Sequence, residues 1–285
     1  MSYNPNIQLV ECPRDAIQGI THFIDTEKKV AYINQLVRSN LFEYIDCGSF
    51  VSPKAVPQMQ DTAAVLADIE LINETRLLAI VANERGAEAG LKSNNLAFLG
   101  YPFSISETFQ QRNANSNITE SFQRVKHIQQ LLAGGSKELI VYISMAFGNP
   151  YGDMWSLELV VDWISKLSAL GVKRFSIADT TAEAIPEQIN ELFTAIYNIF
   201  PRLDFSIHLH SSRPMAALKI EAAYAAGCRR FEGAFLGYGG CPFAKDELVG
   251  NIPMEMLIDR FQSAPPAAVF PLMDGFQNMI TPYGV

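Results

Sequence analysis

The segment KRFSIADTTAEAIPEQINELFTAIYNIFPRLDFSIHLH, at residues 173–210, contains one complete unit of the pattern that decides the fold. Its two ends, 173–178 and 204–210, are short runs rich in Phe, Ile and Leu, which are typical of strands buried on both faces of a parallel sheet. The residues at 187–200 between them have the apolar spacing of an amphipathic helix. The segment therefore predicts a strand–helix–strand unit.

The same pattern extends in both directions along the 285-residue chain. Strands are also expected at 7–12, 43–49, 77–83, 95–101, 138–146 and 229–235, and helices near 25–40, 61–70, 84–92, 117–133, 155–170, 214–226 and 253–262. Gly171 and Gly227 follow two of these helices, at the position where glycine commonly ends a helix. Eight such units fit the ~250 residues of a (β/α)8 barrel better than an open, doubly wound sheet. We therefore predict an α/β fold, a (β/α)8 TIM barrel over residues 1–262.

Two segments do not follow this pattern. Residues 263–285 begin SAPPAAVFPLMDG, and this Pro-rich composition predicts a short irregular C-terminal tail that covers a barrel end or a dimer partner. Residues 103–116, FSISETFQQRNANS, are expected to form a long polar loop after the fourth strand. Loops that follow strands lie on the catalytic face of a barrel, so this loop is expected beside the active site.

Composition narrows the classes of partner. The formal net charge is −8, which disfavours nucleic acid and anionic membranes because both require a basic surface. The sequence contains no apolar run long enough to span a bilayer, and its start lacks the regions of a signal peptide. The four cysteines include no CxxC pair, so we expect a reducing, cytoplasmic location without disulfides.

The most distinctive local feature is the pair His208 and His210 at the end of the seventh expected strand. Strand alternation places both imidazoles on one face, where they can bind one metal ion or form a structural hydrogen-bonded pair. Asp15 follows the first strand and Asn251 follows the last, and each offers an oxygen ligand. Arg14, beside Asp15, can bind an oxyanion or a carboxylate.

The set Asp15, His208, His210 and Asn251 contains oxygen and nitrogen donors and no thiolate. Such a set favours a divalent cation, Mg²⁺ or Mn²⁺, over a structural zinc, and two histidines with one carboxylate also suit non-haem iron. A Schiff-base mechanism is disfavoured because it needs a lysine in the barrel mouth. Lys137 and Lys173 stand at strand starts, which is the opposite end of the barrel.

Other candidate groups lie near the same rim. Asp46 and Asp179 stand at the ends of the second and sixth strands. Cys241 lies in the sequence Gly239-Gly240-Cys241-Pro242 after the last strand, where a cysteine is expected to be accessible on a mobile loop. Cys12 and Cys47 fall within strand patterns and are expected to be inert core residues.

These residues form part of a longer series of motifs. In order along residues 8–262, the series is Pro13-Arg14-Asp15 with Gln18, Ser49-Phe50-Val51-Ser52-Pro53-Lys54, Val56-Pro57-Gln58-Met59, Glu120-Ser121-Phe122-Gln123-Arg124, Asp179-Thr180, His208-Leu209-His210, Gly239-Gly240-Cys241-Pro242-Phe243-Ala244 and Gly250-Asn251. The series resembles the 3-hydroxy-3-methylglutaryl-CoA lyase family. The histidine pair and Arg-Asp are shared with the wider metallolyases, which include isopropylmalate and citramalate synthases.

The resemblance implies cleavage of 3-hydroxy-3-methylglutaryl-CoA to acetyl-CoA and acetoacetate, a reaction of leucine degradation and ketone-body formation. The partners that it implies are an acyl-CoA substrate and a second copy of the chain, as a homodimer. It implies a divalent cation on Asp15, His208, His210 and Asn251. Its catalytic candidates are Arg14, Asp46, Asp179, His208 and Cys241, and its substrate-binding candidates are Gln18, Ser49, Ser176 and Thr180.

Several positions depart from the family pattern. Ala16 stands where Gly is usual, Asp46 where Glu is usual, and Ser211 where an Asp normally follows the histidine pair. Ile140 occupies the position of a substrate-holding Arg, and the segment from Cys241 to Asn251 is one residue longer than in the animal enzymes. These departures leave two alternatives open: a related aldolase or synthase acting on another hydroxy acid or 2-oxo acid, and a catalytically inactive barrel.

Overall fold

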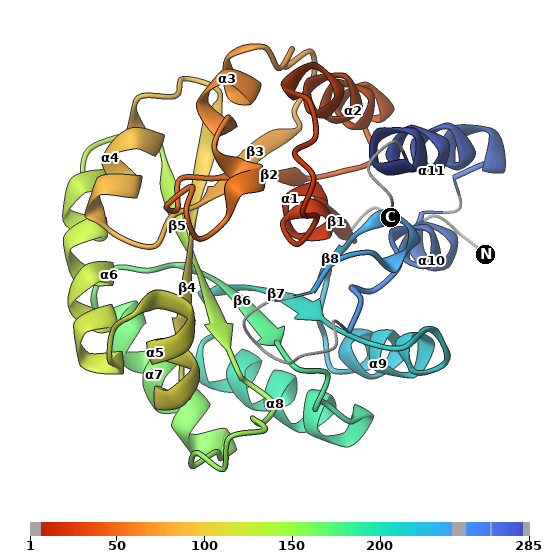
Figure 1. The fold of residues 1–285 in the computed structure, drawn as a ribbon. Helices are drawn as coiled ribbons and strands as arrows, with labels where there is room; N and C mark the ends of the chain where they lie inside the picture. The colour runs from red at the N-terminus through yellow and green to blue at the C-terminus, as the bar shows by residue number, and fades with distance from the viewer. Residues whose placement is uncertain (1–6, 241–248, 263, 282–285) are drawn as a thin grey trace.

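A computed structural model describes residues 7–240, 249–262 and 264–281 of the chain. Eight parallel strands form a closed barrel in chain order, and β8 pairs back with β1 (Figure 1). The strands are β1 (Gln8–Glu11), β2 (Tyr44–Ser49), β3 (Arg76–Ile80), β4 (Leu96–Ser104), β5 (Glu138–Ser144), β6 (Arg174–Asp179), β7 (Asp204–Leu209) and β8 (Arg230–Gly233). The predicted barrel is confirmed.

Helices follow the strands and surround the barrel in Figure 1. They are α1 (Pro13–Ile17), α2 (Thr26–Ser39), α3 (Thr62–Ala67), α4 (Glu84–Leu91), α5 (Glu107–Ala114), α6 (Ile118–Leu132), α7 (Leu157–Ala169), α8 (Pro186–Ile199), α9 (Arg213–Ala225), α10 (Met254–Phe261) and α11 (Pro266–Ile280), with short 3₁₀ turns η1 (Pro57–Met59) and η2 (Phe235–Gly237). Gly171 and Gly227 adopt the left-handed backbone conformation that the helix-ending pattern predicts.

Alternation along the strands divides the core into two parts. One set of side chains fills the barrel interior, including Val10, Tyr44, Leu78, Phe98 and Ile140. The opposite set packs outward against the helices in a larger cluster. Burial on both faces explains why the strands are nearly continuous apolar runs.

The N-terminal end of the barrel carries an ion-pair network. Arg230 donates to the Asp204 carboxylate at 2.7 Å, and Arg174 pairs with both Asp204 and Glu138. These strand-start charges lie at the end of a barrel where conserved polar groups usually serve stability. The chemistry must therefore be sought at the other end.

The prediction of a polar loop over 103–116 is wrong. β4 continues to Ser104, and most of the remaining residues form α5. Ser106 caps this helix, because its hydroxyl accepts a hydrogen bond from the Phe109 N–H at 3.1 Å. Phe109 is buried beneath the helix, so the segment is a packed cover of the barrel rim.

The prediction of an irregular tail over 263–285 is also wrong for its described part. Residues 266–280 form α11, which packs on α2 through buried apolar side chains such as Leu272 and Phe276. Pro266 stands in the first helical turn, where proline is tolerated because the N–H that it lacks would have no helical partner. Packing of the apolar face outweighs the cost of Pro271 farther along the helix.

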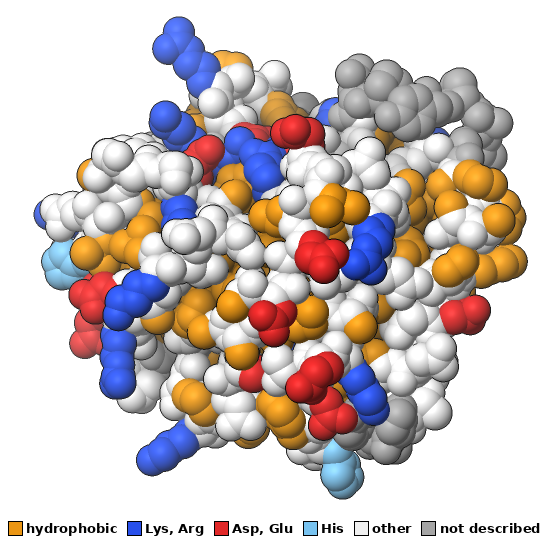
Figure 2. Space-filling model, turned by 90° about the horizontal axis from the view of Figure 1, so that it is seen from above, with side chains coloured by type: hydrophobic (Ala, Val, Ile, Leu, Met, Phe, Trp, Pro, Cys, Tyr) orange, Lys and Arg blue, Asp and Glu red, His pale blue; other side chains and the backbone are white. Residues whose placement is uncertain are grey.

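The outer surface mixes residue types. Figure 2 shows a face on which acidic and basic side chains are interspersed among apolar and uncharged ones. No helix in the described part of the chain combines the length and apolar character needed to cross a membrane.

Candidate active site

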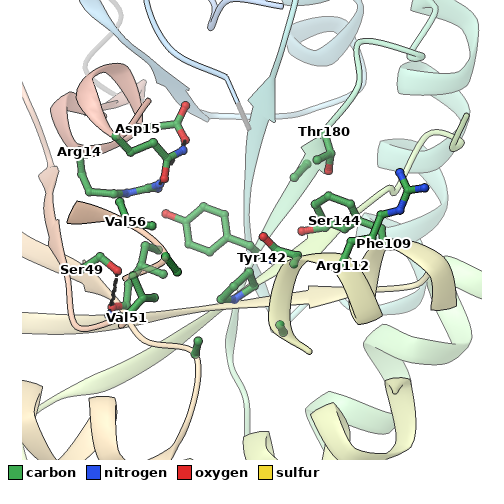
Figure 3. Close-up of a pocket in the computed structure, with 18 of the residues that line it drawn as sticks. Arg14, Asp15, Ser49, Val51, Val56, Phe109, Arg112, Tyr142, Ser144 and Thr180 are labelled. Atoms are coloured by element: carbon green, nitrogen blue, oxygen red, sulfur yellow. Dashed lines mark hydrogen bonds and ion pairs between the residues drawn. The ribbon is translucent and has the colours of Figure 1, made fainter. Parts of the chain in front are cut away.

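A cavity of about 420 Å³ opens at the C-terminal ends of the strands (Figure 3). Its lining combines polar groups from α1 and the end of β7 with apolar side chains from β3, β4, β6 and the segments that follow β2, β3 and β4. The apolar members are Val51, Ala55, Val56, Ile80, Ala82, Pro102, Phe109, Ala114 and Ala178. This end of a (β/α)8 barrel is where the active site of such enzymes lies.

Three predicted ligands converge at one side of the cavity. Asp15, His208 and His210 are all buried, and one donor atom from each lies within 4.8 Å of the others. Asp15 is carried by α1 directly after β1, and His208 is the inward-facing residue near the end of β7. Strand closure brings β1 and β7 to either side of β8, so residues about 190 positions apart in sequence become neighbours.

Asn251 joins this group through the chain that follows the last strand. The backbone of Asn251 forms an isolated antiparallel bridge with that of His210, next to the hydrogen bond from the Ser211 N–H to the Gly250 carbonyl. The Asn251 amide nitrogen donates to Asp15 Oδ2 at 2.6 Å and to the Tyr238 carbonyl at 2.8 Å. Its amide oxygen is buried without a hydrogen-bond partner among the described residues.

An orphaned buried oxygen needs an explanation, because burying a carbonyl oxygen without a partner costs about 1–3 kcal/mol. A hard divalent cation among the Asp15, His208 and His210 donors would supply the missing partner of Asn251. The residues present therefore fit an oxygen–nitrogen cation site.

Gly239 has a steric reason to be glycine. Its backbone has φ +99°, and a Cβ there would lie 2.7 Å from both the Asn251 amide nitrogen and the Asp15 carbonyl. Any larger residue would push apart two of the candidate ligands. Glycine at position 239 therefore permits both the positive φ and the close approach of Asp15 and Asn251.

Electrostatics keep Asp15 and His210 in their binding forms. Burial alone would raise the pKa of Asp15, but the positive charge of Arg14 and the two imidazoles lowers it to about 2. Burial and the neighbouring His208 lower the pKa of His210 to about 4, so this imidazole is neutral near pH 7. An ionised carboxylate and a neutral imidazole are the forms that bind a cation.

Glu232 of β8 orients the His208 ring. The His208 Nδ1 lies 3.1 Å from Glu232 Oε2, and Glu232 Oε1 accepts a hydrogen bond from the Ser206 hydroxyl at 2.6 Å. Burial lowers the pKa of His208, but this hydrogen bond and charge outweigh burial and raise it. A carboxylate on one ring nitrogen fixes the tautomer, which leaves the other nitrogen as a ligand.

Three side chains, Asp46, Asp15 and Gln18, hold the Arg14 guanidinium. Its Nε lies 3.1 Å from Asp46 Oδ2, and its Nη1 donates to Asp15 at 3.1 Å and to Gln18 at 3.0 Å. Asp46 is fully buried and is not among the cavity-lining residues. Burial raises the pKa of Asp46 although the Arg14 charge opposes that shift. Asp46 therefore contacts Arg14 and does not reach the cavity.

Asp179 also lies away from the cavity. Its Oδ2 accepts a hydrogen bond from the Lys219 ammonium at 2.7 Å, and its Oδ1 accepts one from the Ala184 N–H at 3.1 Å. Lys219 also donates to the His210 carbonyl at 2.9 Å. The buried pair thus links the end of β6 to the histidine segment and was not predicted from the sequence.

The four substrate-binding candidates divide into two groups. Gln18, Ser49 and Thr180 line the cavity, whereas Ser176 is fully buried lower in the barrel, beside Glu232. The remaining catalytic candidate, Cys241, lies outside the described residues. Cys47 and Cys12 are buried, as expected for core cysteines.

Tyr142 is a site residue that the sequence analysis missed. It faces the cavity from β5, and Figure 3 shows its ring between Arg14 and Ser144 with the hydroxyl toward the Arg14 side. The hydroxyl is buried and has no hydrogen-bond partner within the described part of the chain. Strand alternation from Ile140 would have placed Tyr142 on the interior face, so a signal was present.

The Lys219–Asp179 pair leads to a prediction about stability. Lys219→Met should destabilise the fold by about 3–5 kcal/mol, because Asp179 would remain as a buried charge without its partner. The midpoint of guanidinium unfolding measures this loss. The double variant Lys219→Met/Asp179→Asn should recover most of it, because the amide oxygen can still accept from Ala184. Equal destabilisation of both variants would show that the pair is not what stabilises this region.

The fold and the site together define a (β/α)8-barrel enzyme with a cluster of side chains that could hold a cation at the C-terminal ends of its strands. The family model described as HMGL-like matches residues 6–269. The hydroxymethylglutaryl-CoA lyase of Bacillus subtilis is 31% identical over 259 residues, covering 90% of this chain and 86% of the relative. The chain therefore belongs to the HMGL-like family of carbon–carbon lyases.

Two further proteins support this assignment. The 3-hydroxy-3-isohexenylglutaryl-CoA/hydroxymethylglutaryl-CoA lyase of Pseudomonas aeruginosa is 32% identical over 258 residues, covering 90% of this chain and 84% of the relative. The solved structure of an HMG-CoA lyase from Acinetobacter baumannii in complex with coenzyme A and 3-methylmalate has a TM-score of 0.90. It is 28% identical, and the match covers 99% of this chain and 93% of that chain.

Proposed function

We propose that this chain cleaves 3-hydroxy-3-methylglutaryl-CoA to acetyl-CoA and acetoacetate by a retro-Claisen reaction. The observation that carries the proposal is the convergence of Asp15, His208 and His210 beside Arg14, in a member of a lyase family. Asp15, His208, His210 and Asn251 would hold Mg²⁺ or Mn²⁺. When bound, the cation supplies Lewis-acid chemistry, which lowers the pKa of a substrate hydroxyl.

Arg14 stabilises the negative charge that forms when the carbon–carbon bond breaks. Loss of the hydroxyl proton converts the alcohol into a carbonyl, and the electron pair of the broken bond becomes the thioester enolate. Arg14 lines the cavity, and Asp46, Asp15 and Gln18 fix its orientation. A fixed cation costs little reorganisation when charge develops, so it favours the transition state over the ground state.

Asp179 and His208 are the two catalytic candidates that could move the hydroxyl proton, and His208 would do so only in place of ligating the cation, because Glu232 engages its other ring nitrogen. His208 lines the cavity, whereas Asp179 is not among the lining residues and is engaged by Lys219. Cys241 would help to return a proton to the enolate carbon.

The cavity walls favour a second candidate substrate with a larger apolar group at C3. The arginines among the described lining residues are Arg14 and Arg112, and Ile140 adds no charge to the interior. A larger apolar group at C3 would contact the apolar side chains of the cavity lining. The Pseudomonas aeruginosa relative is named for 3-hydroxy-3-isohexenylglutaryl-CoA as well as hydroxymethylglutaryl-CoA.

The cellular setting is part of the same proposal. The chain would act as a cytoplasmic homodimer on an acyl-CoA, within leucine degradation or ketone-body formation. Size-exclusion chromatography with light scattering tests the homodimer, and a monomer mass would exclude it.

A panel of acyl-CoA substrates tests the proposed activity. The purified chain, with Mn²⁺, is incubated with 3-hydroxy-3-methylglutaryl-CoA and with 3-hydroxy-3-isohexenylglutaryl-CoA, and acetyl-CoA release is measured. Release from the first substrate supports the main proposal, and faster release from the second supports the alternative. Absence of acetyl-CoA with either substrate would contradict both.

Tyr142→Phe should separate substrate binding from stability. The hydroxyl has no partner among the described residues, so its removal should leave the unfolding midpoint unchanged or slightly raised. If the hydroxyl donates to a substrate oxygen, kcat/KM should fall by roughly 10-fold, which corresponds to about 1.4 kcal/mol. Steady-state kinetics provides the measurement. An unchanged kcat/KM would remove Tyr142 from the substrate-contacting residues.

A further inference from the structure

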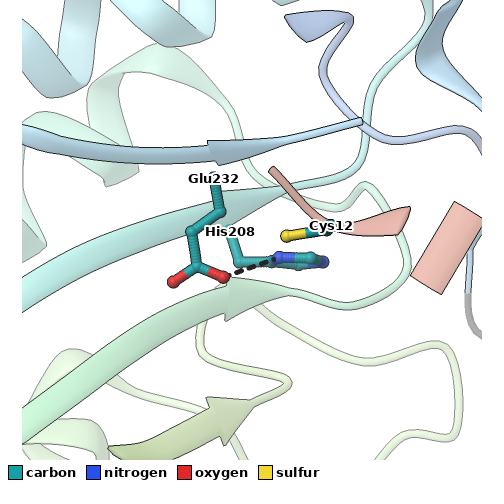
Figure 4. Close-up of side chains that lie close together, drawn as sticks. All are labelled: Cys12, His208 and Glu232. Atoms are coloured by element: carbon teal, nitrogen blue, oxygen red, sulfur yellow. Dashed lines mark hydrogen bonds and ion pairs between the residues drawn. The ribbon is translucent and has the colours of Figure 1, made fainter. Parts of the chain in front are cut away.

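A second group of donors lies directly beneath the candidate cation site. Cys12, His208 and Glu232 are all buried, and one donor atom from each lies within 4.8 Å of the others. Figure 4 shows the three side chains gathered around the His208 ring, on the side of the Glu232 hydrogen bond. The group shares only His208 with the Asp15–His208–His210 set.

The topology explains why these three residues meet. His208 of β7 is in register with Glu232 of β8, and the Cys12 N–H donates to the Gly233 carbonyl at 2.9 Å. β7 and β8 therefore present His208 and Glu232 side by side, and Cys12 follows directly after β1, two residues past Val10, the β1 register partner of Glu232. The sheet fixes His208 and Glu232, and the hydrogen bond to Gly233 holds Cys12 beside β8.

The donors differ in chemistry from those of the upper site. Cys12 offers a sulfur, which favours thiophilic cations such as Zn²⁺ and Cd²⁺ over Mg²⁺ and Mn²⁺. We propose that Cys12, His208 and Glu232 form a second, inhibitory site for a thiophilic divalent cation. Binding would release the Cys12 thiol proton to solvent, and the proton on His208 Nδ1 would move to the other ring nitrogen, so that sulfur, Nδ1 and carboxylate oxygen each donate to the ion.

The shared imidazole makes this site inhibitory. In the present geometry Glu232 engages Nδ1 of His208, which leaves the other ring nitrogen for the upper site. A cation on Nδ1 would displace that hydrogen bond and withdraw Glu232 from orienting the ring. The upper site would then hold its own cation more weakly.

Cadmium absorption tests the new site without reference to catalysis. Cys241→Ser serves as the background, because it removes the thiol of the glycine-rich segment. Titration with Cd²⁺ should give thiolate-to-cadmium absorption in the near ultraviolet, and the additional change Cys12→Ser should abolish it. Cys47→Ser in the same background is the matched control, since Cys47 is also buried but lies in the outer core cluster. Equal absorption with and without Cys12 would overturn the proposal.

Glu232→Gln provides a second variant that leaves the thiol in place. It should weaken Cd²⁺ binding by at least about 10-fold, measured from the same absorption. Unchanged Cd²⁺ affinity would remove Glu232 from the site and contradict the three-donor proposal.

The inhibitory effect rests on the proposed function and is measured separately. Each enzyme is assayed with Mn²⁺ and increasing Cd²⁺, relative to its own rate without Cd²⁺. Cys12→Ser should raise the half-inhibitory Cd²⁺ concentration by at least about 10-fold. Identical sensitivity in the two enzymes would refute inhibition through Cys12. An inactive wild-type chain that still gives the Cys12-dependent absorption would refute the lyase proposal and leave the second site intact.

Discussion

Replacing Arg14 with methionine should lower kcat by about 10²–10³-fold while leaving Mn²⁺ affinity nearly intact. The reason is that a cation facing a developing enolate contributes mainly in the transition state. Arg14 is not one of the candidate ligands, although it contacts the ligand Asp15 at 3.1 Å. Steady-state kinetics gives kcat, and isothermal titration calorimetry gives the Mn²⁺ affinity.

The control for Arg14→Met addresses Asp46, the carboxylate that loses its partner in this variant. Asp46 is fully buried against Arg14, so Arg14→Met also strands a buried acid. The double variant Arg14→Met/Asp46→Leu removes both charges and should restore stability but not turnover. Recovery of turnover in the double variant, or an equal loss of Mn²⁺ binding in Arg14→Met, would show that Arg14 is structural.

Asp15→Asn should abolish most activity by removing the cation. Asp15 is the only carboxylate among the four proposed donors, and its pKa of about 2 keeps it ionised at neutral pH. The substitution keeps the shape of the side chain but removes its charge. Loss of a ligand should weaken Mn²⁺ binding by at least about 100-fold, which exceeds the effect of removing an outer hydrogen-bond partner. Calorimetry with the chelator-treated protein measures the change.

Gln18→Met is the matched variant. Gln18 donates to the Asp15 carboxylate at 2.7 Å but is not among the proposed donors. Its replacement should weaken Mn²⁺ binding less than Asp15→Asn does. Full Mn²⁺ affinity in Asp15→Asn would mean that the ion binds elsewhere.

Much of the fold could be predicted because its strands are buried on both faces. Short, continuous apolar runs predicted all eight strands, and their regular alternation with helices predicted the barrel. The errors occurred where local composition was a poor guide. α5 is polar and is held by the Ser106 cap and the single buried face around Phe109. α11 contains Pro266 and Pro271, and its packing against α2 decides its structure.

The part of the candidate site that could be predicted is the part that follows from where residues stand relative to the ends of the strands. Residues just past strand ends share one rim, which correctly grouped Asp15, His208 and His210 in space. Partners that arise from packing were not predictable. Nothing local to Asp179 indicates that Lys219, 40 residues away on α9, occupies its carboxylate, or that Glu232 lies under His208. Position at the end of a strand therefore could not show that Asp15 lines the cavity whereas Asp46 and Asp179 are buried away from it.

Product analysis of the chelator-treated enzyme tests the central claim most directly. The claim is that an ion held by Asp15, His208, His210 and Asn251 is required to cleave 3-hydroxy-3-methylglutaryl-CoA. With Mn²⁺ restored, acetyl-CoA and acetoacetate should form in equal amounts. Without the cation, neither should form. Equal rates with and without Mn²⁺, or acetyl-CoA without matching acetoacetate, would contradict the account.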